Sequence, residues 1–406
     1  MRIAHFSDLH YGTRTLAEAD RCFGAAIDRA AALGVQAAVI AGDATDHALE
    51  LHTPAAVRLA AQLRRLAECC PVLMLQGTYS HEPPGTLTIF RSLGGRYPIH
   101  VADRIGQVAL TRQHGWVASP GWRFEALPQD ATAVFSCLPA VNKAAVAATL
   151  GASGATAAIG EQIARLLEGF APTHRLARAL GLPSIGVSHG TVFGSVSEHG
   201  VPMASCDHEF TTGALFAAEA QAFMLGHIHR HQGWSRVSEV GEQALAYAGS
   251  TGRFHYGEEG EKGFLLWEVG ARTARYALEP TPARRTIDIV FEGRPDMDAL
   301  REAVARQNVT GASVRVRWSV GEEDSSAVDR AAIQRVLAGA AQTKLEGTIV
   351  PVTRTRAAGI SRLPQLQDKV RAWASVAEVK PEPLLTCLAA LAEDTPEDIA
   401  ARLLAP

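Results

Sequence analysis

Aspartate and histidine residues recur in short motifs along the chain as far as residue 229. They are Asp8 and His10 in SDLHYG, Asp43 in AGDATD, His81 in GTYSHE, His189 in VSHG, and His227 with His229 in LGHIH. Carboxylate and imidazole ligands together favour Mn, Fe or Zn over Ca. In DLH and HIH the two side chains lie two residues apart, so a strand end can direct both into one pocket. So many candidate ligands, with a carboxylate able to bridge, suit two ions about 3.5–4 Å apart better than one.

Each motif follows a segment whose pattern predicts a β-strand. The predicted strands are residues 2–6, 35–40, 72–75, 133–138, 184–187, 222–225, 244–248 and 263–269, and helices are predicted at 16–33 and 54–67. Alternation of strands and helices indicates parallel strands joined by crossover helices. A lone histidine after a strand is more often a partly buried histidine with a hydrogen-bond partner than a metal ligand. Because ligands bind at the ends of strands in open α/β folds, the repeated placement favours a shared site.

Length and composition limit the classes of protein to which the chain can belong. With 406 residues, the chain suggests roughly two to three domains. Apolar residues make up 47% and charged residues 20%, which excludes a wholly disordered or collagen-like chain. The 39 Lys plus Arg and 42 Asp plus Glu give a net charge of -3, which excludes a uniformly basic nucleic-acid binder but not a local basic strip.

Cysteine usage and the absence of membrane signals indicate the compartment. The six cysteines include no CxxC pair, so reduced thiols are expected. No signal peptide or spanning segment is recognisable, and we expect a soluble cytoplasmic protein with no membrane partner.

The pattern changes at residues 280–285 and again near Gly347. A strand (286–291), a helix (295–307) and a strand (313–320) predict a small separate α+β unit, in which Arg315 and Arg317 share one strand face. From about Gly347 the strand pattern is lost, and a basic, Pro-punctuated segment leads into amphipathic helices. Apolar residues recur at helical spacing in this tail, at Leu363, Leu366, Val370 and Trp373.

The ordered series D-x-H, GD, a GxxSH variant of GNH, H and GHxH resembles the calcineurin-like metallophosphoesterase superfamily. Within it, SDLHYG and the later YAGSTGRFHYGEEGEKGF resemble the SbcD-type nuclease subunit of the double-strand-break repair complex. The motifs cover the chain to about residue 269. The resemblance implies an α/β fold with a four-layer sandwich, two sheets flanked by helices, over residues 1–280. It also implies an α+β domain that caps a DNA groove (281–346) and a helical tail that binds an ATPase partner (347–406).

The resemblance further implies a role for each motif residue. The first ion would be held by Asp8, His10 and His229. Asp43 would bridge the two ions. His189 and His227 would hold the second ion. The ions would be two divalent metals, most simply Mn²⁺, and would activate a water for attack on phosphorus. His81 would be catalytic, hydrogen-bonding the phosphate and assisting departure of the 3′-oxygen.

One position departs from the family pattern. The usual Asn ligand of the second ion precedes the catalytic histidine, but Ser80 stands there in the stretch Gly77-Thr78-Tyr79-Ser80-His81. Three outcomes are open: the second ion is weakly held, a water replaces the ligand, or the loop recruits Thr78 or Tyr79. Glu82 is expected to orient a histidine.

Together these features predict a metal-dependent DNA nuclease of break repair, with 3′→5′ exonuclease and single-strand endonuclease activity. Its partners would be DNA, an SbcC-like coiled-coil ATPase subunit and a second copy of the chain in a homodimer. A phosphomonoesterase or small-molecule phosphodiesterase would share every ligand and differ only in the substrate groove. A DNA-end-binding scaffold with weak catalysis is the third hypothesis, because the Asn ligand is missing.

Overall fold

The computed structural model describes residues 1–93, 95–141, 152–201, 209–258, 260–351, 357 and 359–403. The chain divides into two compact units, one formed by Met1–Val290, Met297–Val316 and Ala331–Leu345, the other by Phe291–Asp296, Arg317–Arg330 and Glu346–Pro406. The domain boundaries expected from the sequence stay predictions. Among the described helices, none combines the length and the apolar character that crossing a bilayer would need.

The first sheet has six strands, four of which run parallel to one another. In spatial order they are β15 (Ala274–Pro280), β14 (Gly263–Val269), β1 (Arg2–Phe6), β2 (Ala37–Ala41), β3 (Val72–Leu75) and β4 (Ile99–Ala102). Strands β1 to β4 are parallel, whereas β14 pairs antiparallel with both β1 and β15. Helices α1 (Leu16–Ala32) and α2 (Pro54–Cys69) provide the crossovers expected between the first three strands.

The second sheet has seven strands. In spatial order they are β12 (Gln232–Ser238), β13 (Gly241–Tyr247), β11 (Ala222–Gly226), β8 (Ser184–His189), β7 (Ala131–Leu138), β5 (Gly106–Thr111) and β6 (Gly115–Ala118). Helices α4 (Ala152–Ala179) and α5 (Thr212–Ala217) pack on its outer face, where Leu167 and Phe216 join one apolar cluster with Phe223 and Leu225. A two-stranded sheet, β9 (Thr191–Val192) with β10 (Glu209–Phe210), is formed by residues that lie between α4 and α5 in the chain.

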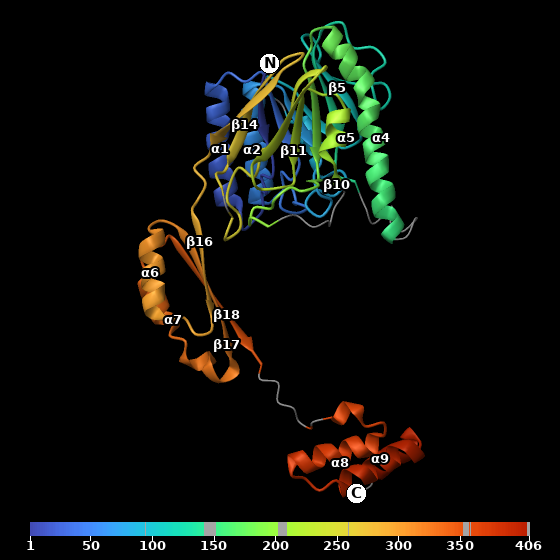
Figure 1. Ribbon diagram of the computed structural model, residues 1–406, viewed down its shortest axis with the longest axis vertical. Coiled ribbons are helices and arrows are strands. Elements are labelled where there is room, and N and C mark those ends of the chain that lie inside the picture. Colours follow the sequence, from blue (N-terminus) through green and yellow to red (C-terminus); the bar gives the residue numbers. More distant parts are fainter. Residues whose placement is uncertain are drawn as a thin grey trace. The chain divides into compact units, whose positions relative to one another are not determined.

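Alternation along the strands builds the four layers. In β2, Ala38 and Ile40 join the cluster beneath α1 and α2, whereas Val39 and Ala41 join the cluster between the two sheets. Such alternation buries both faces of a strand, which explains why β2 reads as an uninterrupted apolar run. Figure 1 shows α1 and α2 on one side of the paired sheets and α4 on the other. The four-layer sandwich expected from the resemblance is confirmed.

The predicted strands of the sandwich are all present, but four edge strands and one internal strand, β5, escaped the sequence analysis. They are β4, β5, β6, β12 and β15. In β12 only alternate early positions are partly buried and the last four residues are exposed. A strand of this kind carries no apolar run, so its pattern resembles a loop.

A smaller three-stranded sheet follows in the chain. Its order is β16 (Thr286–Glu292), β17 (Ser313–Gly321) and β18 (Gln342–Val350), with helices α6 (Met297–Gln307) and α7 (Arg330–Val336). Val314 and Val316 are buried while Arg317 is exposed and Arg315 is half-buried, as the alternation in β17 predicts. The strand pattern does not end near Gly347 as expected, because β18 continues to Val350.

The tail is helical, as expected. It contains α8 (Leu366–Ala377), α9 (Glu382–Glu393) and α10 (Pro396–Leu403). A short 3₁₀ segment, Ile360–Arg362, precedes α8, and two others lie earlier in the chain at Thr86–Ser92 and Glu322–Ala327. Helix α10 begins directly after Thr395, whose hydroxyl caps it by accepting from the Asp398 N–H at 3.3 Å.

The cluster between the sheets should carry much of the stability of the sandwich. Trp267 is fully buried there, so Trp267→Ala should lower the free energy of unfolding by about 3–5 kcal/mol in urea titrations followed by far-UV circular dichroism. The control is Val237→Ala on β12, where the side chain is 80% exposed, and it should change that free energy by less than about 0.5 kcal/mol. Equal effects of the two changes would contradict the assignment of this core.

Candidate metal centre

The polar motifs meet at the carboxyl ends of strands from both sheets. Asp8 follows β1, Asp43 follows β2, and His189 is the last residue of β8. Backbone hydrogen bonds join the loops: Asp8 N–H donates to the Gly42 carbonyl at 3.1 Å, and His227 N–H donates to Asp8 Oδ1 at 3.1 Å. The expectation that these residues share one edge is therefore met in the structure.

The candidate ligands fall into two groups. In each group one ligand atom per residue lies within 4.8 Å of the others, and the groups are Asp8, His10 and His229, and Asp43, His189 and His227. The first group contains the residues that the resemblance implies for the first ion, and the second contains those implied for the second ion together with Asp43, the expected bridge. Asp43 lies in the second group, and its charge also raises the pKa of His10 in the first, so the two groups are electrostatically coupled.

The first group offers neutral imidazoles beside a buried carboxyl. His10 Nε2 and His229 Nε2 are 2.8 Å apart, and both Nδ1 atoms are buried without a hydrogen-bond partner. Burial lowers the pKa of His10 to about 4 and holds that of His229 well below its ordinary value. Burial also raises the pKa of Asp8 to about 7. Neutral ring nitrogens with unused lone pairs fit a divalent cation, which would also stabilise the carboxylate form of Asp8.

The second group contains an ion pair. His189 Nδ1 donates to the Ala41 carbonyl at 2.8 Å, which directs Nε2 toward Asp43 Oδ2 at 3.3 Å. Burial acts to lower the pKa of His189, but Asp43 outweighs it and raises the value to about 10. For Asp43, burial is likewise outweighed by His189, and its pKa falls below the usual range. A divalent cation at this position would take the place of the His189 proton, as metal binding to histidine requires.

Four candidate ligands adopt left-handed backbone conformations. Their φ angles are 51° for Asp8, 47° for His10, 50° for Asp43 and 106° for His227. In the described chain only seven non-glycine residues have positive φ, so more than half of them belong to this site. Such conformations are unfavourable for residues with a Cβ and concentrate at functional sites.

Thr78, one of the two residues that could replace the missing Asn ligand, lies beside the second group. The Thr78 hydroxyl lies 3.2 Å from Asp43 Oδ2 and 3.1 Å from His189 Nε2, whereas Ser80 is exposed. Thr78 N–H also donates to Asp43 Oδ1 at 2.7 Å. Gly77 makes this approach feasible, because a Cβ there would lie 2.2 Å from Asp43 Oδ1. Thr78 is thus the loop residue placed with the second group.

Glu82 acts on the loops and not on a histidine, which corrects the sequence-based expectation. Its fully buried carboxylate accepts the Gly77 N–H at 2.5 Å and the Ala44 N–H at 2.6 Å. Burial, with Asp43 nearby, raises the pKa of Glu82 to about 8. The side chain therefore joins the loop after β2 to the loop after β3, which carry Asp43 and Thr78.

His81 lies beside the first group. Its Nδ1 donates to the Asp46 carbonyl at 2.6 Å, and its ring centroid is 4.9 Å from that of His10. The Nδ1 bond leaves Nε2 for a substrate. Asp46 forms a further potential metal-binding group with His10 and His81. Its position three residues after Asp43 in GDATD was the only available signal.

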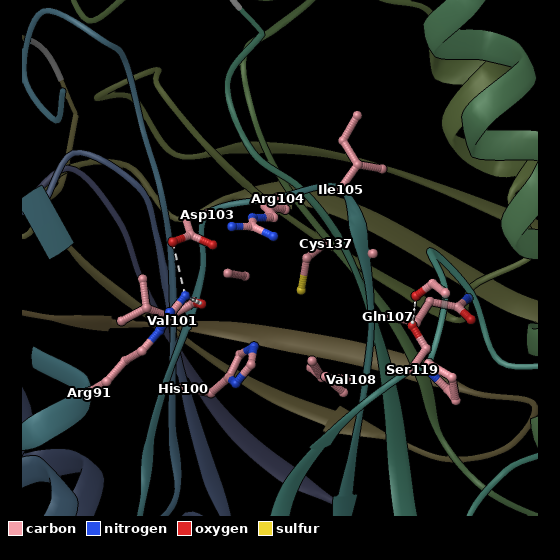
Figure 2. A pocket seen from close by; sticks show the side chains of 15 residues that line it. Arg91, His100, Val101, Asp103, Arg104, Ile105, Gln107, Val108, Ser119 and Cys137 are labelled. Carbon is pink, nitrogen blue, oxygen red and sulfur yellow. Dashed lines mark hydrogen bonds and ion pairs between the residues drawn. The ribbon is translucent and has the colours of Figure 1, made fainter. Parts of the chain in front are cut away.

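Two cavities are relevant to the choice of site. One of about 470 Å³ is lined by Asp46 and His255 from beside the metal groups, together with Arg14, Thr15, His199, Phe254, Tyr256, Arg284, Arg315 and Lys344. A second, of about 610 Å³, opens between β4 and the β5–β6 hairpin, and Figure 2 shows His100 and Cys137 pointing into it. Its lining includes none of the candidate ligands, so cavity size alone does not identify the metal centre.

Comparisons with known proteins give likeness at the level of structure. No protein-family model matches the chain. No curated protein matches it either. Among solved structures, a dimetal phosphatase from Danio rerio is similar with a TM-score of 0.41 and 10% identity, covering 68% of this chain and 98% of that one.

A second similar structure is a 5′-nucleotidase precursor from Thermus thermophilus. Its TM-score is 0.32 at 14% identity, and the match covers 70% of this chain and 55% of that one. Similarity this low gives no information about the substrate of this chain. The chemistry therefore has to be inferred from the residues themselves.

The position of Thr78 leads to a paired test. Thr78→Ala should weaken binding of the second Mn²⁺ by about tenfold or more, because it removes the hydroxyl between Asp43 and His189. Ser80→Ala, which changes an exposed hydroxyl two residues away, should leave both affinities unchanged. Isothermal titration with Mn²⁺ measures both. Weaker binding in Ser80→Ala with normal binding in Thr78→Ala would reverse the assignment.

Proposed function

We propose that the protein is a DNA nuclease that hydrolyses phosphodiester bonds with two divalent metal ions, Mn²⁺ being the best candidate. By the family resemblance, its activities would be 3′→5′ exonucleolytic on duplex ends and endonucleolytic on single strands, in the repair of double-strand breaks. The metal chemistry is supported by the two Asp/His groups at the strand ends. The choice of a polymeric substrate needs a separate argument.

The cationic cavity beside the metal groups carries that argument. Four cationic side chains line it, Arg14, Arg284, Arg315 and Lys344, against the single carboxylate of Asp46. Part of this charge is already paired, because Arg315 forms an ion pair with Asp288 at 2.9 Å. Excess positive charge next to a phosphate-cleaving centre favours a substrate with several phosphates, since each neutralised phosphate adds to affinity through counterion release.

Tyr256 and His255 add a second feature of nucleic-acid sites. Both line the cavity, and the Arg315 guanidinium lies 5.0 Å from the Tyr256 ring centroid. Aromatic faces and arginine planes are the groups on which bases stack in proteins that bind single strands. A small phosphomonoester would need the metal groups but not a lining drawn from residues 284 to 344, so the polymer is favoured over the small substrate.

The side chains of this chain divide the chemistry between them. When bound, the two ions would supply a water of lowered pKa and charge stabilisation for the phosphate. His81, held through Nδ1 by the Asp46 carbonyl, presents Nε2 as the proton donor for the departing 3′-oxygen. Glu82 keeps the loops of Asp43 and Thr78 together while the substrate is turned over.

His81→Ala tests the proposal most directly. Cleavage of an end-labelled DNA duplex in Mn²⁺ should fall by about 10²–10⁴-fold, because a positioned general acid contributes that much. Mn²⁺ binding at the two Asp/His groups should persist, since His81 belongs to neither of them. Labelled products on a denaturing gel give the rate.

The control is His114→Ala, an exposed histidine in the hairpin between β5 and β6, which should cleave at the wild-type rate. If the wild-type protein makes no metal-dependent DNA product, alone or with a cognate ATPase, the nuclease proposal is wrong. Turnover of nitrophenyl phosphates or cyclic nucleotides in its place would identify the small-substrate enzyme. Absence of bound metal would identify the scaffold.

The tail is proposed to bind the ATPase partner. Helices α8 and α9 leave large apolar side chains exposed, including Leu366 at 58%, Val376 at 58% and Leu391 at 67%. Ala374 is the one buried residue among the described side chains of α8. Helices of this kind are suited to pack on the helices of a coiled coil. A second copy of the chain remains a further proposed partner.

Deleting residues 351–406 should abolish association with an SbcC-like coiled-coil subunit and leave Mn²⁺ binding intact. Each large apolar side chain buried in such a contact contributes roughly 1.5–3 kcal/mol. The cut follows β18, so the three-stranded sheet stays complete. Co-elution on size-exclusion chromatography and metal analysis provide the readouts. Loss of the metals or aggregation of the truncated protein would mean that the tail packs on its own chain.

A further inference from the structure

A buried ion pair lies against the metal centre without taking part in the chemistry described above. Lys262, the residue before β14, and Glu258 place Nζ and Oε2 2.5 Å apart, and both side chains have no exposed surface. Burying two opposite charges costs desolvation energy, and replacing such a pair by apolar residues is often neutral or stabilising. Stability alone is thus a weak reason for the pair.

The lysine ammonium is directed at the backbone of a candidate ligand. Besides Glu258, its Nζ donates to the His229 carbonyl at 2.8 Å and to the Ser250 hydroxyl at 3.0 Å. The ion pair with Glu258 and these two hydrogen bonds surround the ammonium group with three oxygen atoms. Ser250 N–H donates to the same His229 carbonyl at 3.2 Å. The His229 backbone is therefore held by two donors from the segment that precedes β14.

The glutamate acts on the other side of the same ligand. Glu258 Oε1 accepts the backbone N–H groups of Phe254 at 3.0 Å and His255 at 2.6 Å. The His255 ring stacks on the His229 ring, with centroids 5.9 Å apart and an interplanar angle of 12°. One carboxylate therefore fixes the residue that packs on the His229 imidazole, and its ammonium partner fixes the His229 main chain.

We propose that Lys262 and Glu258 are positioning residues that hold His229 in the orientation its metal ion requires. The inference rests on the dinuclear centre proposed above. Neither residue belongs to the group Asp8, His10 and His229, although Glu258 forms a further potential metal-binding group with His229 and His255. Their role is to keep one imidazole in place before the ion arrives, so the ion does not have to order the loop. Groups that orient metal ligands typically contribute 10–100-fold to metal affinity.

Cobalt binding to three variants tests this role. Lys262→Met and Glu258→Gln should each lower the melting temperature and weaken binding of Co²⁺ to one of two sites by about 10–100-fold, with altered d–d absorption bands. The double variant K262M/E258Q removes both charges and should recover most of the melting temperature. It should not recover the Co²⁺ affinity, because the bond to the His229 carbonyl is still missing.

A second ion pair provides the matched control. Arg178 and Glu219 are 2.5 Å apart with side chains 9% and 18% exposed, and they lie near the amino ends of the strands, away from the metal groups. R178M/E219Q should bind Co²⁺ as the wild type does. If K262M/E258Q recovers Co²⁺ affinity along with melting temperature, or if Lys262→Met binds Co²⁺ normally, the pair serves stability only and the inference fails.

The readout separates this inference from the nuclease proposal. A wild-type protein that binds two Co²⁺ ions but cleaves no DNA would overturn the nuclease proposal and leave the positioning role standing. A wild-type protein that binds no Co²⁺ would overturn the metal centre and the positioning role together.

Discussion

The metal centre depends on the close approach of two strand ends that belong to different sheets. Strand β11 ends at Gly226, and a Cβ at that position would lie 1.9 Å from the Ala41 carbonyl oxygen and 2.4 Å from Ser7 Oγ. A side chain there would force the sheets apart. Because glycine allows the contact, His227 and His229 on the second sheet come within reach of Asp8 on the first.

The same contact explains the electrostatics of the site. Residues that meet at the junction of two sheets lose their water, and burial drives the pKa values of Asp8 and His10 to about 7 and about 4. In the Asp43–His189 pair each charge stabilises the other, which raises the pKa of His189 and lowers that of Asp43. A cluster with this much desolvated polar surface adds little to folding, and perturbed groups of this kind are typical of functional sites.

Around the candidate ligands, a layer of polar side chains ties loops together. Glu82 joins the loops after β2 and β3, and Lys262 with Glu258 braces the segment around His229. All three are fully or almost fully buried. Most of their hydrogen bonds go to backbone groups, so these side chains fix the course of the loops. The cavity beside them has a cationic lining, and the proposed substrate would bind there.

The sequence by itself was sufficient to predict most of the central strands and the crossover helices, and to single out the candidate ligands. Buried strands such as β2 read as apolar runs because both faces are covered, and polar residues stand out where those runs end. Edge strands such as β12, with one exposed side, lack that signal. Tertiary structure decided the rest. Thr78 meets Asp43 and His189, which are 35 and 111 residues away, while the neighbouring Ser80 points to solvent. The direction of a side chain in a turn, like the pairing of Lys262 with the His229 carbonyl, depends on which distant segments pack around it, and no local pattern encodes that.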